Sequence, residues 1–122
     1  AQRFESGSPN MMGIAALNAS LGLLLDIGIE NIQAKVMANA TYLIEQFSKL
    51  PEITILTPTM TARHGGIITF QKGGVDNVQL YQYLQDKNVI CAYRGDGIRF
   101  SPHFYTSRQV MDKALKLLSE FC

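Results

Sequence analysis

Arg99 is the residue whose type and surroundings most clearly suggest chemistry. It lies in the apolar run GIRFS. Because neighbouring side chains of an extended chain point to opposite faces, Ile98 and Phe100 share one face and Arg99 and Ser101 share the other. Pro102 ends the run because it has no N–H for a sheet hydrogen bond. A planar guanidinium forms two parallel charge-assisted hydrogen bonds with a carboxylate, which a lysine cannot do. Alternation alone leaves two alternatives for this face, open solvent or a functional site.

Other polar side chains give weaker signals. Ser8 precedes Pro9 and a long apolar stretch, so we expect Ser8 to cap a helix whose N-terminus is also a natural anion site. For His103, in a turn after the strand, we expect a structural role that bonds backbone groups rather than acid–base chemistry. Arg94 lies at a predicted hairpin turn, where solvent is the expected surrounding and an approach to an active site is the alternative. His64 has no second ligand nearby, so no metal site is expected.

The elements that position these residues follow from apolar spacing and from Gly and Pro breaks. The run MMGIAALNASLGLLLDIG is apolar on nearly every side, which predicts a helix buried in a larger assembly. The remaining pattern predicts an α+β fold in which a small, mostly antiparallel sheet is covered by helices. After the first helix, which Gly28 ends, we expect helices over residues 29–50, 75–86 and 107–121, and strands over 53–56, 66–70, 88–93 and 97–101.

Composition excludes several classes of function. Of the 122 residues 47% are hydrophobic, enough for a core, and the formal net charge of +1 comes without a basic stripe, so no nucleic-acid partner is expected. The most apolar stretch, residues 21–29, contains Asp26 and two glycines and is too short to span a membrane. Cys91 and Cys122 form no disulfide framework, which favours a reducing, cytoplasmic location. Because no initiator Met opens the chain, we expect it to be part of a longer protein.

Two motifs carry a resemblance to a known family. RFESGSPN (residues 3–10) and GIRFSPHFYTS (residues 97–107) resemble the class V aminotransferase family, which belongs to the fold-type I pyridoxal-phosphate enzymes. The family patterns read Arg-Phe-Glu-x-Gly-Thr-Pro-Asn and Ile-Arg-x-Ser-Pro-His-x-Tyr-Asn-Thr, and RHGGIITF (residues 63–70) resembles the strand before the small-domain helix. The resemblance implies an interdomain helix segment over residues 1–27, tied to a large domain, and a C-terminal small domain over residues 28–122.

The resemblance also implies roles for two residues. Arg99 matches the arginine that binds the α-carboxylate of the amino acid substrate. Ser8 stands where the family has a threonine whose hydroxyl reaches the cofactor phosphate of the neighbouring subunit in a homodimer. The cofactor, pyridoxal 5'-phosphate, is held as a Schiff base on a lysine upstream of these motifs. No lysine here has that context, so the chain alone is expected to be inactive and to contain no catalytic residue.

Cys91 separates the possible activities within this resemblance. Cysteine desulfurases carry a nucleophilic cysteine on a mobile loop between the last two strands, after a Gly-His-His-like stretch. Here that interval is only residues 94–97, and Cys91 falls inside a predicted strand, where a buried thiol is ordinarily inert. A desulfurase is therefore disfavoured, and transamination, lyase and epimerase chemistry stay open, as do the amino acid and its acceptor. The alternative from a different class is a non-catalytic α+β module that binds a ligand or a partner.

Overall fold

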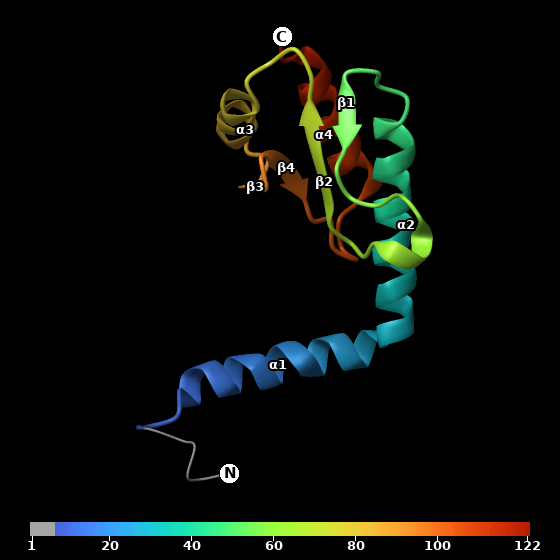
Figure 1. Cartoon of the computed structure of the whole chain (residues 1–122). Coiled ribbons are helices and arrows are strands. Elements are labelled where there is room, and N and C mark those ends of the chain that lie inside the picture. The colour runs from blue at the N-terminus through green and yellow to red at the C-terminus, as the bar shows by residue number, and fades with distance from the viewer. Residues whose placement is uncertain (1–6) are drawn as a thin grey trace. The chain divides into compact units, whose positions relative to one another are not determined.

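The protein, seen in a computed structural model that describes residues 7–122, forms two compact units. The first unit reaches Ile32, and the second runs over Gln33–Cys122. Family-like Arg3 and Glu5 lie outside the described residues. The elements are α1 (Met11–Ile27), α2 (Ile29–Phe47), β1 (Ile53–Ile55), a short 3-10 helix η2 (Thr61–Arg63), β2 (Ile68–Lys72), α3 (Asn77–Asp86), β3 (Ala92–Arg94), β4 (Gly97–Phe100) and α4 (Arg108–Glu120) (Figure 1).

Helix α1 begins at Met11, and its N-cap is Asn10. The prediction that Ser8 caps this helix is wrong, because the Asn10 side chain accepts the N–H of Gly13 at 2.9 Å. Asparagine and serine are about equally good N-caps, so the geometry of the turn decides between them. At the other end Gly28 adopts φ 89° and donates its N–H to the carbonyls of Leu24 and Leu25, which confirms the predicted helix end.

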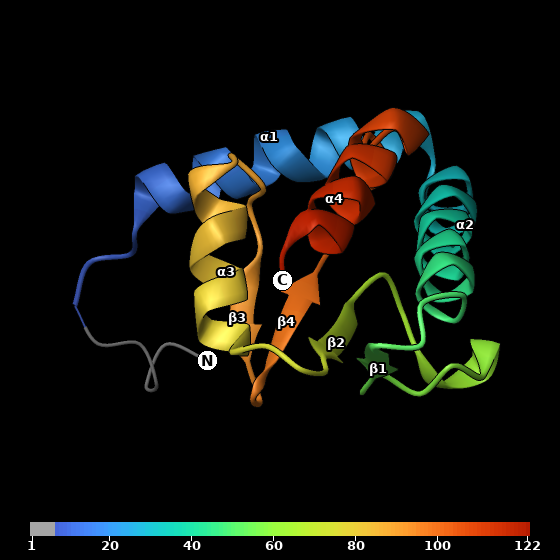
Figure 2. The ribbon, with the colours of Figure 1, turned by 90° about the horizontal axis from the view of Figure 1, so that it is seen from above.

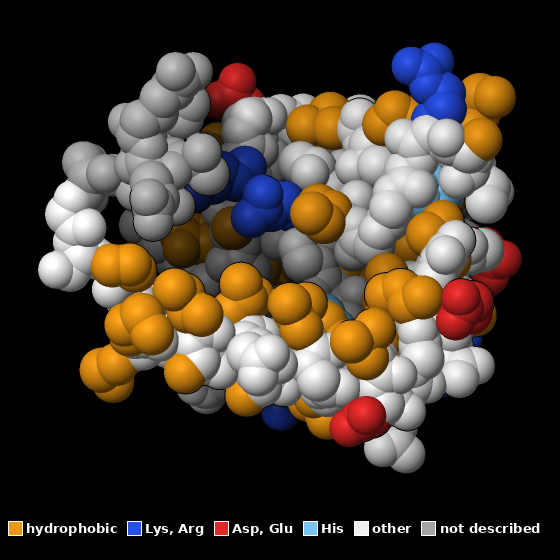
Figure 3. All heavy atoms as spheres, turned by 90° about the horizontal axis from the view of Figure 1, so that it is seen from below, with side chains coloured by type: hydrophobic (Ala, Val, Ile, Leu, Met, Phe, Trp, Pro, Cys, Tyr) orange, Lys and Arg blue, Asp and Glu red, His pale blue; other side chains and the backbone are white. Residues whose placement is uncertain are grey.

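No side chain of α1 is buried, although the helix is strongly apolar. Figure 3 shows its hydrophobic side chains lying in a row along the helix. No single helix in the described part of the chain is long and apolar enough to cross a membrane, and only α1 and α2 taken together pass by length and composition. The large exposed apolar side chains of α1 are Met11, Met12, Ile14, Leu17, Leu21, Leu23 and Leu25.

A four-stranded antiparallel sheet lies at the centre of the second unit. Its strand order is β1-β2-β4-β3, which can be followed across Figure 2. Arg99 on β4 pairs with Thr69 on β2 and with Ala92 on β3. The prediction of a mostly antiparallel sheet is confirmed, and so is the hairpin that joins β3 to β4.

One face of the sheet carries the hydrophobic core, and the helices α2, α3 and α4 pack on it. Phe70 is fully buried, and its ring centroid lies 4.5 Å from the ring centroid of Phe47 on α2 and 5.1 Å from that of Phe100. Such aromatic clusters bury large apolar areas and account for much of the hydrophobic stabilisation of a small core. The other buried members of the cluster are Ala40, Leu43, Ile68, Leu80, Leu84, Ile98, Met111, Ala114 and Leu118.

Two predicted boundaries are wrong in detail. The strand expected from residue 88 begins only at Ala92, because Asn88 adopts φ 61° and the N–H of Val89 bonds the carbonyl of Leu84, so the chain is still leaving α3. Helix α2 ends at Phe47 rather than at Leu50, and the N–H of Leu50 bonds the carbonyl of Phe47 in a tight closing turn.

Candidate functional site

The second face of the sheet is polar and partly open. Paired residues of an antiparallel ladder, and every second residue along each strand, share one face. Starting from Arg99, the pairings place seven residues on this side, which we call the open sheet face. Its members are Thr54, Thr69, Gln71, Ala92, Arg94, Gly97 and Arg99.

Arg99 extends from the open sheet face beside a hollow of about 260 Å³. Its neighbours along β4, Ile98 and Phe100, are buried in the core, which confirms the predicted alternation. The Nε atom of Arg99 is buried and has no hydrogen-bond partner among residues 7–122. A buried donor without a partner is unusual in folded proteins, so a ligand with an acceptor group fits this position. The hollow, called the Arg99 hollow below, is lined by Ile90, Cys91, Ala92, Arg99 and Ser101.

The backbone around Arg99 is held by the β3–β4 turn. Gly95 and Asp96 both adopt positive φ, 55° and 60°, which suits a two-residue hairpin turn. Gln71 on β2 donates from Nε2 to the Asp96 carbonyl at 2.8 Å. At Gly97 a Cβ would lie 2.8 Å from the carbonyl oxygen of Phe70, so only glycine fits where β4 starts against β2. These contacts fix the strand that presents Arg99.

The segment after β4 is fixed through its backbone. Asn39, a buried residue of α2, donates from Nδ2 to the carbonyls of His103 and Thr106 at 2.9 and 3.2 Å. The His103 ring stacks on Tyr105, with centroids 4.7 Å apart, and its Nδ1 has no partner in the described part of the chain. The structural contacts of His103 are made by its backbone, since its C=O accepts from Asn39 and its N–H donates to Oγ1 of Thr106. The role of its side chain stays a prediction. Ser107 caps α4, and its hydroxyl accepts the N–H of Val110.

Cys91 lines the Arg99 hollow, and its thiol is contacted by Gln85 of α3, a helix on the core face of the sheet. Gln85 on α3 donates to the Cys91 carbonyl at 2.9 Å and contacts its Sγ at 3.8 Å. Burial raises the pKa of the Cys91 thiol, and the Gln85 contact opposes this in part. A thiol that stays protonated is a poor nucleophile. Cys91 precedes β3 rather than lying inside it, yet the expectation of an inert thiol agrees with these surroundings.

Ser8 is exposed, and it lies three positions before Met11, the first residue of α1. No hydrogen bond of its hydroxyl lies within residues 7–122, so this group is available to a phosphate oxygen. The Arg99 hollow has no lysine in its lining. These residues therefore fit a contributing role toward pyridoxal phosphate and its substrate, with Ser8 suited to the phosphate and Arg99 to the substrate carboxylate.

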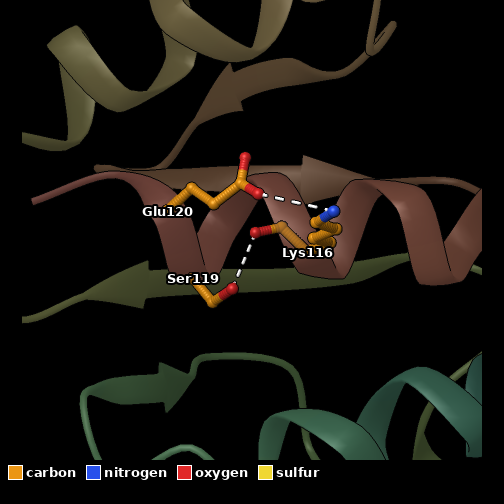
Figure 4. Close-up of polar contacts among 3 residues, drawn as sticks. All are labelled: Lys116, Ser119 and Glu120. Carbon is orange, nitrogen blue, oxygen red and sulfur yellow. Dashed lines mark hydrogen bonds and ion pairs between the residues drawn. The ribbon is translucent and has the colours of Figure 1, made fainter.

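The charges of the open sheet face have no counter-ion of their own. The ion pair found within residues 7–122 joins Lys116 to Glu120 at 3.8 Å on the surface of α4, where Ser119 also donates to the Lys116 carbonyl (Figure 4). Arg99 and Arg94 take part in no such pair within that range. No three His, Cys, Asp or Glu side chains in this part of the chain come together as metal ligands.

The sequence pattern identifies some of these neighbours and not others. Ser101 shares a face with Arg99 by alternation, so its place beside the hollow follows from the sequence. Ile90, which precedes β3, and Ala92 are not identified, because strand register decides which residues lie beside Arg99 and apolar spacing alone does not fix that register. The one available clue is the short hairpin, which limits the register once the turn residues are known.

Comparison with known proteins relates this arrangement to described enzymes. A probable cysteine desulfurase of Ureaplasma parvum is 29% identical over 132 residues, covering 98% of this chain and 32% of the relative. An uncharacterized aminotransferase, YcbU of Bacillus subtilis, is 28% identical over 115 residues, covering 94% of this chain and 30% of the relative. The chain therefore spans about a third of the length of these curated relatives.

Solved structures show the same fold. A cysteine desulfurase of Thermococcus onnurineus matches with a TM-score of 0.86 and 22% identity over 97% of this chain and 32% of that chain. The cystine C-S lyase C-DES, in complex with cysteine persulfide, also matches with a TM-score of 0.86 and 22% identity, over 98% of this chain and 32% of that chain. The family model named aminotransferase class-V matches residues 1–109. This match contains both motifs in full, and the chain belongs to the class V aminotransferase family.

Proposed function

We propose that this chain is the substrate-carboxylate-binding part of a longer, pyridoxal-phosphate-dependent enzyme that acts on an amino acid. The observation that carries the proposal is Arg99, whose buried Nε has no partner within residues 7–122 and whose side chain borders a hollow of about 260 Å³. Family membership supports the amino acid substrate and the cofactor. The coverage of about a third of each relative supports a contribution from a second, larger part of the protein.

In this proposal the chain's own residues bind and orient the substrate. Arg99 donates two parallel hydrogen bonds to the α-carboxylate, which sets the direction of the bonds at Cα. Gln71 and Gly97 keep the hairpin rigid, so the guanidinium needs little rearrangement on binding. Ser8 donates its hydroxyl to the cofactor phosphate. When bound, pyridoxal phosphate supplies an electron sink for cleavage of a bond at the amino acid Cα.

The names of the relatives suggest a sulfur amino acid as the substrate, and the residues of the β3–β4 hairpin limit the type of reaction. Both a probable cysteine desulfurase and a cystine C-S lyase resemble this chain. The β3–β4 turn of residues 95–96 contains no cysteine, and Cys91 is half-buried with a raised pKa. We therefore favour lyase or transfer chemistry that needs no thiol from this hairpin. The proposed activity therefore differs from the one that the desulfurase relatives are named for. The chain as a whole is nevertheless similar to these relatives, which the hairpin by itself does not indicate.

The proposal includes a homodimer located in the cytoplasm. The support for a dimer is the exposed Ser8, whose hydroxyl makes no hydrogen bond within residues 7–122 and suits a phosphate bound by a neighbouring subunit. The support for the location is two free cysteines, Cys91 and Cys122, which suit a reducing compartment.

Replacement of Arg99 in the complete enzyme tests the proposal. Arg99→Ala should weaken amino acid binding by on the order of 2 to 5 kcal/mol, as for other desolvated carboxylate pairs. This corresponds to a loss of roughly thirtyfold or more in kcat/KM. Arg99→Lys should recover only part of the loss, because an ammonium cannot form the paired bonds. Cofactor absorbance should remain in both variants.

Lys113→Ala provides the control, since Lys113 is exposed on α4, which packs on the opposite face of the sheet. This variant should keep its kcat/KM. If Arg99→Ala also keeps it, or loses it only together with the far-ultraviolet circular dichroism of the fold, Arg99 is a surface residue. The non-catalytic module would then be the better description.

A further inference from the structure

Ile90 is a large apolar residue that the proposed function leaves without a role, and its side chain is 95% exposed. It lies between the end of α3 and the start of β3, and it lines the Arg99 hollow. A single exposed apolar side chain is common on protein surfaces and needs no function. Ile90 differs because it borders two hollows at once, and one of them contains the proposed carboxylate site.

The second hollow has a volume of about 110 Å³ and adjoins the Arg99 hollow at Ile90 and Ser101, which line both. No charged residue of the range 7–122 belongs to its lining, so we call it the apolar hollow. An apolar cavity of about 150 Å³ holds a benzene ring, so a hollow of this size accommodates an alkyl or thioether chain. Its walls include Val89, Phe100, Pro102, Val110, Met111 and Ala114.

The two hollows differ in polarity along the direction of β4. Arg99 is the one charged residue that lines the Arg99 hollow among the described residues. Ser101 comes two residues after Arg99, a separation of about 6–7 Å along an extended chain. A cation at one end and apolar walls at the other match an amino acid whose carboxylate binds Arg99 and whose side chain is apolar. The methyl group of alanine is too short to bridge this separation, whereas the side chain of methionine is long enough.

The backbone on both sides of Ile90 is fixed by α3. The N–H of Val89 bonds the carbonyl of Leu84 at 2.8 Å, and the Gln85 side chain donates to the Cys91 carbonyl at 2.9 Å. These two bonds hold Ile90 at the junction of the two hollows before any ligand arrives. An apolar surface that is already in place loses little conformational entropy on binding, which favours affinity.

We propose that Ile90 determines substrate specificity by contacting an uncharged, extended side chain of the amino acid. The substrate carboxylate binds Arg99, and its side chain passes Ile90 into the apolar hollow. Burial of alkyl or thioether groups against Ile90 supplies the binding energy, as for other apolar surfaces removed from water. This inference rests on the proposed function, because it requires Arg99 at the substrate carboxylate, and it agrees with a sulfur amino acid as the substrate.

The test measures how affinity depends on the length of the substrate side chain in the complete enzyme. Dissociation constants are obtained from the change in cofactor absorbance for L-alanine, L-2-aminobutyrate, L-norleucine and L-methionine. Wild type should bind L-norleucine and L-methionine at least about tenfold more tightly than L-alanine, because a fully buried methylene contributes roughly fourfold. L-Glutamine should bind no more tightly than L-alanine, since its amide would be buried without a hydrogen-bond partner.

Replacement of Ile90 should then remove this dependence on length. Ile90→Ser should reduce the advantage of the two long side chains to less than about threefold and change the affinity for L-alanine by less than about twofold. Ile90→Val should keep most of the advantage, because it loses only one methylene. Val78→Ser is the matched control, since Val78 is an exposed apolar residue of α3, which packs on the core face of the sheet. It should leave all affinities unchanged.

Two results would overturn the inference. One is an equal affinity of wild type for the short and the long side chains. The other is an Ile90→Ser variant that keeps the dependence on length but has a lower melting temperature, because Ile90 would then pack against the rest of the protein. The proposed function fails separately, if Arg99→Ala leaves the affinity for every one of these amino acids unchanged.

Discussion

Asn39 and His103 are 64 positions apart in the chain and are joined by a hydrogen bond of 2.9 Å from the Asn39 side chain to the His103 carbonyl. The same amide donates to the Thr106 carbonyl, so one buried residue of α2 holds both ends of the turn that follows β4. The segment with the family motif therefore depends on a residue outside the motif.

Asn39→Ala should destabilise the protein by about 1–3 kcal/mol, because the Thr106 carbonyl loses the Asn39 donor and the His103 carbonyl keeps only the N–H of Thr106. The change should appear as a lower midpoint of urea unfolding with an unchanged slope. Gln33→Ala, at an exposed position of the same helix, should change the midpoint little. An Asn39→Ala midpoint equal to that of wild type would show that water replaces the bond without loss.

Gly97→Ala should be destabilising for a steric reason. The added Cβ would lie 2.8 Å from the Phe70 carbonyl oxygen and 3.0 Å from the Leu56 side chain, and the strand backbone cannot move away freely. Overpacking of this kind costs about 1–3 kcal/mol. Gly65→Ala is the matched control, since nothing lies within 4 Å of its added Cβ. Thermal unfolding of both variants measures the difference, and equal melting temperatures would contradict the steric explanation.

The fold follows from the sequence more completely than the site does. Alternation of Ile98, Arg99 and Phe100 correctly predicts which face each residue takes, since burial of two apolar neighbours decides the phase of the strand. The pairing of Arg99 with Thr69 on β2 is a long-range relationship that local spacing does not encode. The start of β3 is mispredicted for a related reason, because the positive φ of Asn88 depends on the contact of the turn with α3.

Lys72 is another residue whose position the local pattern does not predict. It follows Ile68 and Phe70 on the core face of β2, and it is buried. Its Nζ donates to the carbonyls of Leu118 and Phe121 at 2.8 and 2.5 Å, near the C-terminal end of α4. A cation at the C-terminus of a helix satisfies free carbonyls and interacts favourably with the helix dipole.

Lys72→Met should keep the apolar stem but lose these charged hydrogen bonds, at a cost of about 1.5–3 kcal/mol. Amide hydrogen exchange should then increase in the last turn of α4 more than in α3. Lys49→Met, which replaces an exposed lysine bonded only to Gln46, should leave both stability and exchange unchanged. Unchanged exchange in the last turn of α4 of the Lys72→Met variant would show that the helix end does not need the cation.

Cys91 and Cys122 provide a comparison of buried and exposed thiols within one chain. Burial raises the pKa of the Cys91 thiol, so its neutral form is favoured in the folded state. The unfolded thiol, with a pKa of about 8.5, loses its proton first as the pH rises. The folded state then binds more protons than the unfolded state, and Cys91 lowers the free energy of unfolding progressively as the pH rises above that value.

Thiol labelling of the folded protein should show that burial delays deprotonation of Cys91. In Cys122→Ser, which keeps Cys91, alkylation by iodoacetamide should be slow, and its rate should rise at a higher pH than in Cys91→Ser, which keeps the exposed Cys122. The reason is that only the thiolate reacts, and burial delays its formation at Cys91. Gln85→Ala should move the rise to still higher pH, because the Gln85 contact stabilises the thiolate. A Cys91 labelling rate that rises at or below the pH found for Cys122 would instead identify an activated thiol. In that case the Arg99 hollow would contain a nucleophile, and the exclusion of desulfurase chemistry from this hairpin would no longer stand.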